Sequence, residues 1–293
     1  MKKIVNRLLI FFLGLPAIVA IVLLFPGYNY LIFNIVVVIF SSLGAIELSV
    51  MLAQKQLIIP KFEAAILGLL PPFAMILIIS FGFNPLLLPA VTASSLSWLL
   101  VSRIFIRGKA LDNFIYRFAG GCAVLLYPGM LLTWLVRMSR WDEISGAVIL
   151  VFFGIVFAGD SIAWAAGMLF GKGNQGVVPV SPNKSIAGFI GGIIASIAVG
   201  IGAAILLPEI FITQYDSFLG IPVIAGLILG LTTGAGAILG DLGESAIKRS
   251  SGLKDSGSII PGRGGVLDSI DSVSLAAPVF YIVFSLLFAQ PSI

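Results

Sequence analysis

Histidine is absent from this 293-residue chain, and cysteine occurs once. Without histidine the chain cannot build a Ser-His-Asp triad, a histidine-ligated zinc site or a histidine general base. The single Cys122 excludes an intrachain disulfide, and it lies in an apolar segment, which indicates packing rather than catalysis. Any chemistry must therefore rest on carboxylates, hydroxyls and the cations of lysine and arginine.

Charge is also scarce, because Asp, Glu, Lys and Arg together make up 10% of the residues. A soluble domain usually carries about 25%. Hydrophobic residues reach 59%, and the mean hydropathy is +1.14. These values predict an all-α, polytopic integral membrane protein, because helices satisfy their own backbone hydrogen bonds in lipid. The net charge of +4 indicates membrane topology rather than nucleic-acid binding, since no soluble basic domain is present.

About nine apolar runs are candidate membrane spans. They cover residues 8–25, 31–53, 64–80, 84–101, 119–136, 146–169, 186–207, 219–240 and 274–289. The first resembles a signal peptide but lacks a clear small-residue cleavage site, so we expect a retained helix. No repeat or linker separates domains. We expect one polytopic domain over 1–293, with N-terminal helices in 1–140 and catalytic helices and motif loops in 146–293.

The cations are distributed unevenly between the loops. If the N-terminus lies inside, the inside segments contain Lys2, Lys3, Arg7, Lys55, Lys61, Arg103, Arg107, Lys109, Arg117, Lys172, Lys184, Lys248, Arg249, Lys254 and Arg263. Arg137 and Arg140 fall outside, beside two acidic residues. By the positive-inside rule we expect a cytoplasmic N-terminus, an outside C-terminus, and motif loops on the cytoplasmic side of a bacterial inner membrane.

Residues 241–271, DLGESAIKRSSGLKDSGSIIPGRGGVLDSID, hold an unusual concentration of charge for such a chain. No helix breaker follows the eighth span, so we expect helix to about Ser250, with Asp241, Ser245 and Lys248 on one face and Glu244 beside them. Carboxylates and cations interleaved with glycine suit a divalent metal and the phosphates that it neutralises. The alternative is a basic loop that only obeys topology, but five acidic residues argue against it.

The second half of this segment predicts a tight turn. Ser250-Ser251-Gly252 can end the helix, and Pro261-Gly262 followed by Gly264-Gly265 lets the backbone turn. Such a turn can bring Asp268 and Asp271 back towards Asp241, and glycine allows backbone N–H groups to approach phosphate.

A second segment, residues 159–188, holds a carboxylate within an apolar span. Asp160 needs a partner or a polar cavity there, and pairing with a cation at a helix end is the alternative. Gly159, Ala163 and Gly167 form a small-residue stripe for close helix packing. The loop that follows offers side chains suited to phosphate or nucleobase contacts, namely Lys172, Ser181, Asn183, Lys184 and Ser185. Glu47, also within a span, either binds a group in a cavity or is a buried protonated acid.

The two segments together resemble the phosphatidate cytidylyltransferases, membrane enzymes that make CDP-diacylglycerol from CTP and phosphatidate. The family signature appears as Ser245, Lys248-Arg249, Lys254-Asp255, Gly257, Pro261-Gly262, Gly264-Gly265, Asp268 and Asp271. The upstream sequences GDSIAWAAGMLFGK and SPNKSIAG are similar to that family as well. The resemblance covers at least residues 159–275.

The resemblance implies that a phosphatidate oxygen attacks the α-phosphorus of CTP and expels pyrophosphate, with Mg²⁺ as cofactor. It implies Asp241 and Asp268 as first-choice metal ligands, with Asp271 and Asp160 as further candidates. Lys248, Arg249, Lys254 and Arg263 would hold the triphosphate and the lipid phosphate, and Ser245 would bond an oxygen or complete the metal shell. The remaining substrate-binding candidates are Lys172, Ser181, Lys184, Gly264 and Gly265. The small-residue helix faces fit either packing within the chain or a homodimer.

Three positions depart from the family pattern. Arg263 replaces a histidine, Ser269 replaces an arginine, and Ala187 replaces an acidic residue. Arg263 stays cationic at every working pH, whereas Ser269 cannot pair with a carboxylate as arginine does. These departures make a catalytically impaired or altered-specificity paralogue one alternative. A CTP-dependent membrane lipid kinase is another, and a transporter that uses Glu47, Asp160 and Asp241 as a polar pathway is a third.

Overall fold

The structure, a computed structural model, describes residues 14–102, 104, 113–214, 221–260 and 264–288. Within these ranges it is helical, with isolated β-bridges as the only extended pairing. Contacts divide the chain into two units: residues 1–140 with 247–270, which we call unit 1, and residues 141–246 with 271–293, which we call unit 2. The boundaries fall inside the last two helices, α10 (Pro222–Ser250) and α11 (Leu267–Leu287).

The predicted membrane helices are present, with different lengths. Seven helices of the described chain are long and apolar enough to cross a bilayer: Gly27–Ala53, Lys61–Phe81, Phe114–Arg140, Ser145–Phe170, Ile186–Leu206, Pro222–Ser250 and Leu267–Leu287. The apolar helices Gly14–Leu24 and Leu87–Val101 are shorter. Each of the nine predicted spans thus overlaps a helix, and two of these helices fall short of the usual length of about 20 residues.

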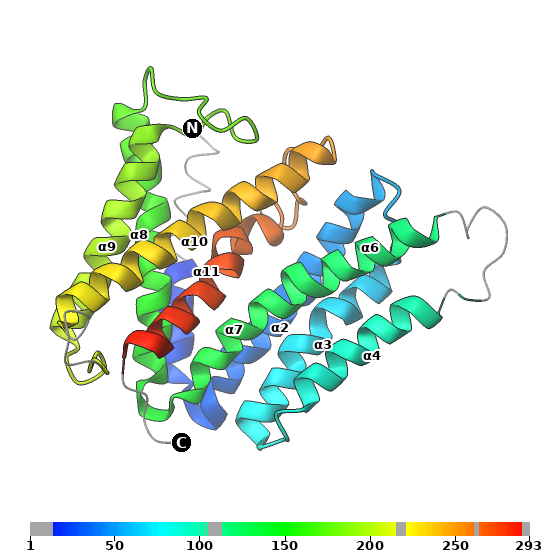
Figure 1. The fold of residues 1–293 in the computed structure, drawn as a ribbon, viewed down its shortest axis with the longest axis horizontal. Helices are drawn as coiled ribbons and strands as arrows, with labels where there is room; N and C mark the ends of the chain where they lie inside the picture. Colours follow the sequence, from blue (N-terminus) through cyan, green and yellow to red (C-terminus); the bar gives the residue numbers. More distant parts are fainter. Residues whose placement is uncertain (1–13, 103, 105–112, 215–220, 261–263, 289–293) are drawn as a thin grey trace. The chain divides into compact units, whose positions relative to one another are not determined.

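Unit 1 contains α2 (Gly27–Ala53), α3 (Lys61–Phe81), α4 (Leu87–Val101), α6 (Phe114–Val124) and α7 (Leu131–Arg137) (Figure 1). A π-helical segment, Leu125–Met130, joins α6 to α7, and Pro128 lies inside it. The Ser41 hydroxyl of α2 lies 2.6 Å from the Gly68 carbonyl oxygen and 2.7 Å from that of Pro128. It therefore donates to a backbone carbonyl of α3 or of the π-helical segment, one at a time.

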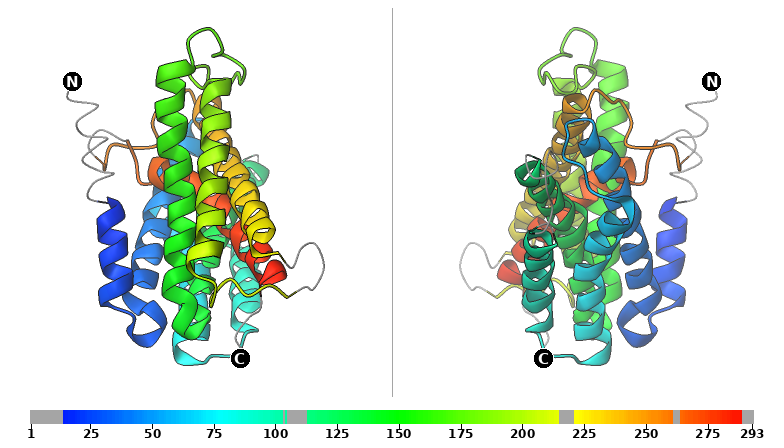
Figure 2. Two further views of the ribbon diagram at one scale, coloured as in Figure 1. Left: turned by 90° about the vertical axis from the view of Figure 1, so that its left-hand side faces the viewer. Right: turned by 90° about the vertical axis from the view of Figure 1, so that its right-hand side faces the viewer.

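Unit 2 contains α8 (Ser145–Phe170) and α9 (Ile186–Leu206), which run antiparallel side by side (Figure 2). Small residues allow this approach, as predicted for the stripe at Gly159, Ala163 and Gly167. A Cβ built on Gly159 would lie 2.6 Å from the Ser196 hydroxyl, and one on Gly192 would lie 3.0 Å from the Ala163 Cβ. The predicted stripe is confirmed.

The part of α10 that belongs to unit 2 packs closely on both neighbouring helices. A Cβ on Gly230 would lie 2.4 Å from the Ser196 carbonyl oxygen of α9. A Cβ on Gly240 would lie 2.4 Å from the Asp271 carbonyl oxygen of α11. Gly240 therefore lets α10 approach the backbone of α11 at the position of a candidate site residue.

Aromatic side chains fill the interior of unit 2. Neighbouring rings stack or meet edge to face at centroid distances between 4.8 and 5.8 Å, among them Trp141, Phe152, Phe211, Phe280, Tyr281, Phe284 and Phe288. Such pairs add about 0.5–1.5 kcal/mol each beyond their buried area. They anchor α11 to α8 and to the segment after α9.

Candidate active site

Asp268, in the first turn of α11, is the centre of a buried hydrogen-bond network in unit 1. Its Oδ2 accepts hydrogen bonds from the backbone N–H of Gly265 at 2.7 Å and of Ser256 at 2.8 Å. Its Oδ1 forms an ion pair with the Lys248 ammonium group, which comes from the last turns of α10. Two members of the predicted signature, Lys248 and Asp268, are thus in direct contact.

Glu47 belongs to the same network, although it comes from α2. Its Oε1 accepts a hydrogen bond from the Val266 N–H at 3.0 Å, and its Oε2 accepts one from the Leu267 N–H at 2.8 Å. The Ser256 hydroxyl lies 2.9 Å from Glu47 Oε2 and also 2.9 Å from Asp268 Oδ2. Glu47 therefore fixes the start of α11.

The turn predicted between the two halves of the signature is present. The backbones of Ile260 and Gly264 pair in both directions, with N–O distances of 2.9 and 3.0 Å. Gly264 has a φ of +117°, which favours glycine, and a Cβ there would lie 2.4 Å from Asp268 Oδ2. The N–H groups of Gly264 and Gly265 bond to Ile260 and Asp268 in this structure, and their contact with substrate stays a prediction. Pro261, Gly262 and Arg263 lie outside the described residues.

Arg249 and Lys254, the other signature cations among the described residues of unit 1, face outward. Both are exposed, and the Arg249 guanidinium donates to the Leu253 carbonyl oxygen at 3.3 Å. Helix α10 ends at Ser250, as predicted, and Gly252 follows with a φ of +73°. Ser269, which replaces the family's arginine, bonds to the Gly265 carbonyl oxygen through its hydroxyl at 3.4 Å.

Unit 2 holds a second group of charges. The Lys184 ammonium group forms an ion pair with Asp241 of α10. Asp271 of α11 lies near enough to Asp241, Glu244 and Asp160 to interact with them electrostatically. The prediction that the chain brings Asp271 towards Asp241 is thus confirmed. A bound cation would relieve the mutual repulsion of such carboxylates.

The loop before α9 is held by its own polar residues. Ser185 caps α9 by accepting a hydrogen bond from the Gly188 N–H at 3.1 Å. Its backbone forms a bridge with Gln175, and the Asn174 side chain donates to the Phe170 carbonyl oxygen at 2.9 Å. Lys184, directly before Ser185, is thereby positioned beside Asp241. Lys172 in this loop is exposed, and Ser181 is half-buried.

Carboxylates are the donors that Mg²⁺ prefers, but they do not form a complete cage here. Among the described residues no group of three or more Asp, Glu, His or Cys side chains is arranged to hold a metal ion. Mg²⁺ usually takes only one or two protein carboxylates and completes its shell with water and substrate phosphates. Asp241 and Asp271 in unit 2 and Asp268 in unit 1 stay candidate ligands, and Asp241 and Asp268 are each paired with a lysine in this structure.

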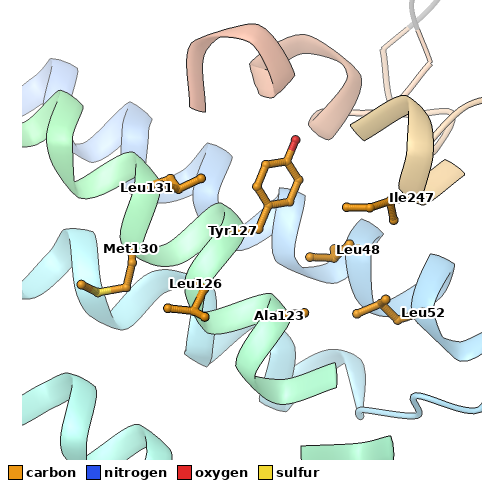
Figure 3. A pocket seen from close by; sticks show the side chains of 8 residues that line it. All are labelled: Leu48, Leu52, Ala123, Leu126, Tyr127, Met130, Leu131 and Ile247. Carbon is orange, nitrogen blue, oxygen red and sulfur yellow. The ribbon is translucent and has the colours of Figure 1, made fainter. Parts of the chain in front are cut away.

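An apolar groove of about 410 Å³ lies on unit 1 (Figure 3). The groove is lined by Leu48, Leu52, Ala123, Leu126, Tyr127, Met130, Leu131 and Ile247. Leu48 directly follows Glu47, and Ile247 directly precedes Lys248. The groove therefore begins at residues adjacent to the Asp268 network.

Comparison with known proteins identifies the family. The model of the cytidylyltransferase family matches residues 5–287. The chain belongs to the cytidylyltransferase family. It is 44% identical over 151 residues to a phosphatidate cytidylyltransferase of Haemophilus influenzae, covering 50% of this chain and 49% of that protein. It is 34% identical over 216 residues to one of Brucella abortus, covering 67% and 74%.

A phosphatidate cytidylyltransferase of Bacillus subtilis is 35% identical over 162 residues, covering 55% of this chain and 56% of that protein. The alignment with the Haemophilus relative spans about half the length of either chain. The cytidylyltransferase family match, by contrast, extends over nearly all of this chain.

The sequence of this cytidylyltransferase family member indicated most of these residues, but it missed Ser256 and the role of Glu47. Ser256 directly follows the Lys254-Asp255 pair, so its position was a usable signal. For Glu47 the signal was a carboxylate inside an apolar helix, which requires a polar partner. No pattern in the sequence shows that this partner is the backbone of Val266 and Leu267.

Proposed function

We propose that this protein transfers the cytidylyl group of CTP to phosphatidate, which gives CDP-diacylglycerol and pyrophosphate. One structural observation supports the proposal most directly. The signature residues Lys248, Gly265 and Asp268 meet in a single buried network with Ser256. Membership of the cytidylyltransferase family, and the printed names of the relatives, support the same reaction.

In this reaction an oxygen of the phosphatidate phosphate forms a bond to the α-phosphorus of CTP. The bond from that phosphorus to the oxygen bridging to the β-phosphorus breaks, and pyrophosphate leaves. A phosphate monoester is largely ionised near pH 7, since its second pKa is about 6, so no histidine base is needed. Positioning and charge neutralisation would lower most of the barrier.

The cations would bind the phosphates. Arg249 and Lys254 are exposed and free to reach a triphosphate or a lipid headgroup, and we assign Arg263 the same role. Lys184 and Lys248 are paired with Asp241 and Asp268, which holds their ammonium groups in fixed positions. We assign the nucleotide side to Lys184, with Lys172 and Ser181 from the same loop, and we assign Ser245 to a phosphate oxygen.

We propose Mg²⁺ as the cofactor, with Asp241 of unit 2 and Asp268 of unit 1 as first-choice candidate ligands and Asp271 and Asp160 as further candidates. When bound, Mg²⁺ would neutralise charge on the triphosphate and on the departing pyrophosphate. The Asp268 oxygens already accept hydrogen bonds from Gly265, Ser256 and Lys248, which would orient this carboxylate before the ion binds.

We place one acyl chain of the lipid in the apolar groove of unit 1. Leu48 and Ile247 line this groove, and they are the sequence neighbours of Glu47 and Lys248. A lipid with a chain in the groove would therefore have its phosphate end beside the Lys248–Asp268 pair. The absence of polar side chains from the groove, the Tyr127 hydroxyl excepted, matches the chemistry of an acyl chain.

We further propose that all nine apolar helices cross or enter the inner membrane, with a cytoplasmic N-terminus and an outside C-terminus. The distribution of cations between loops supports this orientation. Reporter fusions at the C-terminus test it: alkaline phosphatase should be active there and green fluorescent protein dark. The opposite result would reverse the orientation. The homodimer stays a prediction, since small-residue faces of α8, α9 and α10 are used within unit 2.

The deciding experiment is an assay of the purified, detergent-solubilised protein with CTP, phosphatidate and either Mg²⁺ or EDTA. We expect CDP-diacylglycerol and pyrophosphate in equal amounts with Mg²⁺ and none with EDTA. A monophosphorylated lipid alcohol together with CDP would instead identify a CTP-dependent lipid kinase. Binding of CTP without turnover would identify the impaired paralogue, and reversion of Arg263, Ser269 and Ala187 to the family's residues would then be expected to restore activity.

A further inference from the structure

Glu47 is a carboxylate of a membrane helix whose hydrogen bonds all lead to the signature segment. It is buried, with 5% of its surface exposed, and it lies within α2, six residues before that helix ends at Ala53. Its two oxygens accept from the N–H groups of Val266 and Leu267, which precede and begin α11. A carboxylate at a helix N-terminus satisfies unpaired N–H groups and interacts favourably with the helix dipole.

Ser256 links Glu47 to Asp268. Its hydroxyl lies 2.9 Å from a carboxylate oxygen of each, and it accepts a hydrogen bond from the Asp268 N–H at 3.2 Å. A hydroxyl has one proton, so it donates to one of the two carboxylates at a time. The position of the Asp268 carboxylate therefore depends on a side chain that Glu47 also holds.

Two glycines surround the Glu47 carboxylate. A Cβ on Gly257 would lie 2.4 Å from Glu47 Oε1, and a Cβ on Gly265 would lie 2.2 Å from Glu47 Oε2. The chain on both sides of the turn thus closes around this one carboxylate, at a distance that only glycine permits. Both glycines belong to the family signature, and the structure gives a physical reason for them.

We propose that Glu47 is a positioning residue for the transfer reaction: it fixes Ser256 and the start of α11 so that Asp268 and its partner Lys248 are held in their working geometry. The inference rests on the proposed function, because it assigns Asp268 and Lys248 to the substrates. Glu47 itself has no contact with the reacting groups in this role. It acts through Ser256 and through the backbone at the start of α11.

Glu47→Gln is the first test, because it keeps the size of the side chain and replaces an acceptor oxygen with a donor NH₂. That NH₂ would face the N–H of Val266 or Leu267, or the Ser256 hydroxyl. We expect kcat to fall about 10- to 100-fold, as for partners that orient a catalytic group. The KM values for CTP and phosphatidate should stay within about twofold, because the groups that bind substrate remain. Glu63→Gln is the matched control: Glu63 lies in α3 of the same unit and accepts from the Trp98 indole N–H at 3.2 Å.

Ser256→Ala is the second variant, since it removes the link without placing a new donor beside Glu47. If both residues act through Asp268, the double variant should lose much less than the product of the two single losses. Multiplicative losses would overturn the proposal. So would a Glu47→Gln protein with the kcat of the Glu63→Gln control.

Hydrogen exchange supplies a readout that needs no turnover. We expect faster amide exchange in Glu47→Gln over residues 256–268, with unchanged exchange over α3 and α7. An even increase throughout unit 1, with kcat falling in proportion to the folded fraction, would mean that Glu47 only stabilises the fold. If the unaltered protein makes no CDP-lipid, the proposed function fails, and local exchange still decides whether Glu47 orders this segment.

Discussion

Lys184 and Asp241 form an ion pair across 57 residues of sequence, between the loop before α9 and helix α10. Both side chains remain partly exposed, at 25% and 30%. An exposed pair contributes at most about 1 kcal/mol to folding, so its stabilising effect is small. The pair is better explained by what it would do for a phosphate and its metal ion.

Asp241→Asn should remove metal-dependent turnover while leaving membrane insertion intact. We expect CDP-diacylglycerol formation to fall about 100-fold or more, because an amide cannot neutralise a divalent ion. The measurement is turnover at increasing Mg²⁺, with insertion checked by membrane fractionation. Lys184→Met is the matched variant, since it keeps the carboxylate, and we expect a smaller loss that includes a higher KM for CTP. Near-normal turnover of Asp241→Asn would refute the ligand assignment.

Asp268→Ala should destabilise the protein more than Lys248→Met does. Removal of Asp268 breaks the buried ion pair with the Lys248 ammonium and removes the acceptor of the Ser256 and Gly265 N–H groups. Loss of one member of a buried pair costs about 3–5 kcal/mol. In Lys248→Met the Asp268 carboxylate keeps the hydrogen bonds that it accepts from the N–H groups of Ser256 and Gly265, so we expect a smaller loss of stability. Thermal unfolding in detergent measures both, and equal losses would contradict the network described here.

Gly257→Ala should lower both stability and kcat. The new Cβ would lie 2.4 Å from Glu47 Oε1, so the carboxylate or the loop must move. Gly202→Ala is the control, because a Cβ there meets no atom within 4 Å and alanine favours the helix by up to about 1 kcal/mol. Thermal unfolding of the two variants measures the loss of stability, and turnover assays measure the loss of kcat. A Gly257→Ala protein that behaves like Gly202→Ala would show that the loop is not closed around Glu47.

Ala123→Phe should narrow the apolar groove and raise the KM for phosphatidate. We expect the KM for CTP to stay unchanged, and lipids with short acyl chains to be affected less than those with long chains. Ile115→Phe, which places an aromatic ring on the exposed side of α6 outside the groove, is the control. A rise in KM that is the same for all chain lengths would argue against an acyl chain in the groove.

Much of the fold follows from the sequence because lipid imposes a simple rule. Apolar runs of about 20 residues form helices: seven of the nine predicted spans coincide with helices long enough to cross a bilayer, and α10 extends to Ser250 as predicted. Hydropathy is less informative about helix ends: α11 begins at Leu267, seven residues before the predicted span, since Asp268 and Asp271 lower the hydropathy there.

The site was predictable where residues share a helix or a motif and less so where they meet across the chain. Asp241, Ser245 and Lys248 follow from helical spacing, whereas the partner of each charge does not. The pairing of Lys184 with Asp241 and of Glu47 with Val266 and Leu267 depends on tertiary packing. Local spacing contains no information about such contacts.

The hydrogen bonds of Glu47 determine which parts of this chain can be exchanged with a relative. Transplanting residues 241–271 alone would bring a loop shaped around a carboxylate that the recipient's α2 must supply at the right depth and rotation. Helix α2 and the segment that Glu47 contacts should therefore be exchanged together, although more than 200 residues of sequence separate them. A chimera that moves both together should turn over faster than one that moves the loop alone into a recipient whose α2 lacks this carboxylate.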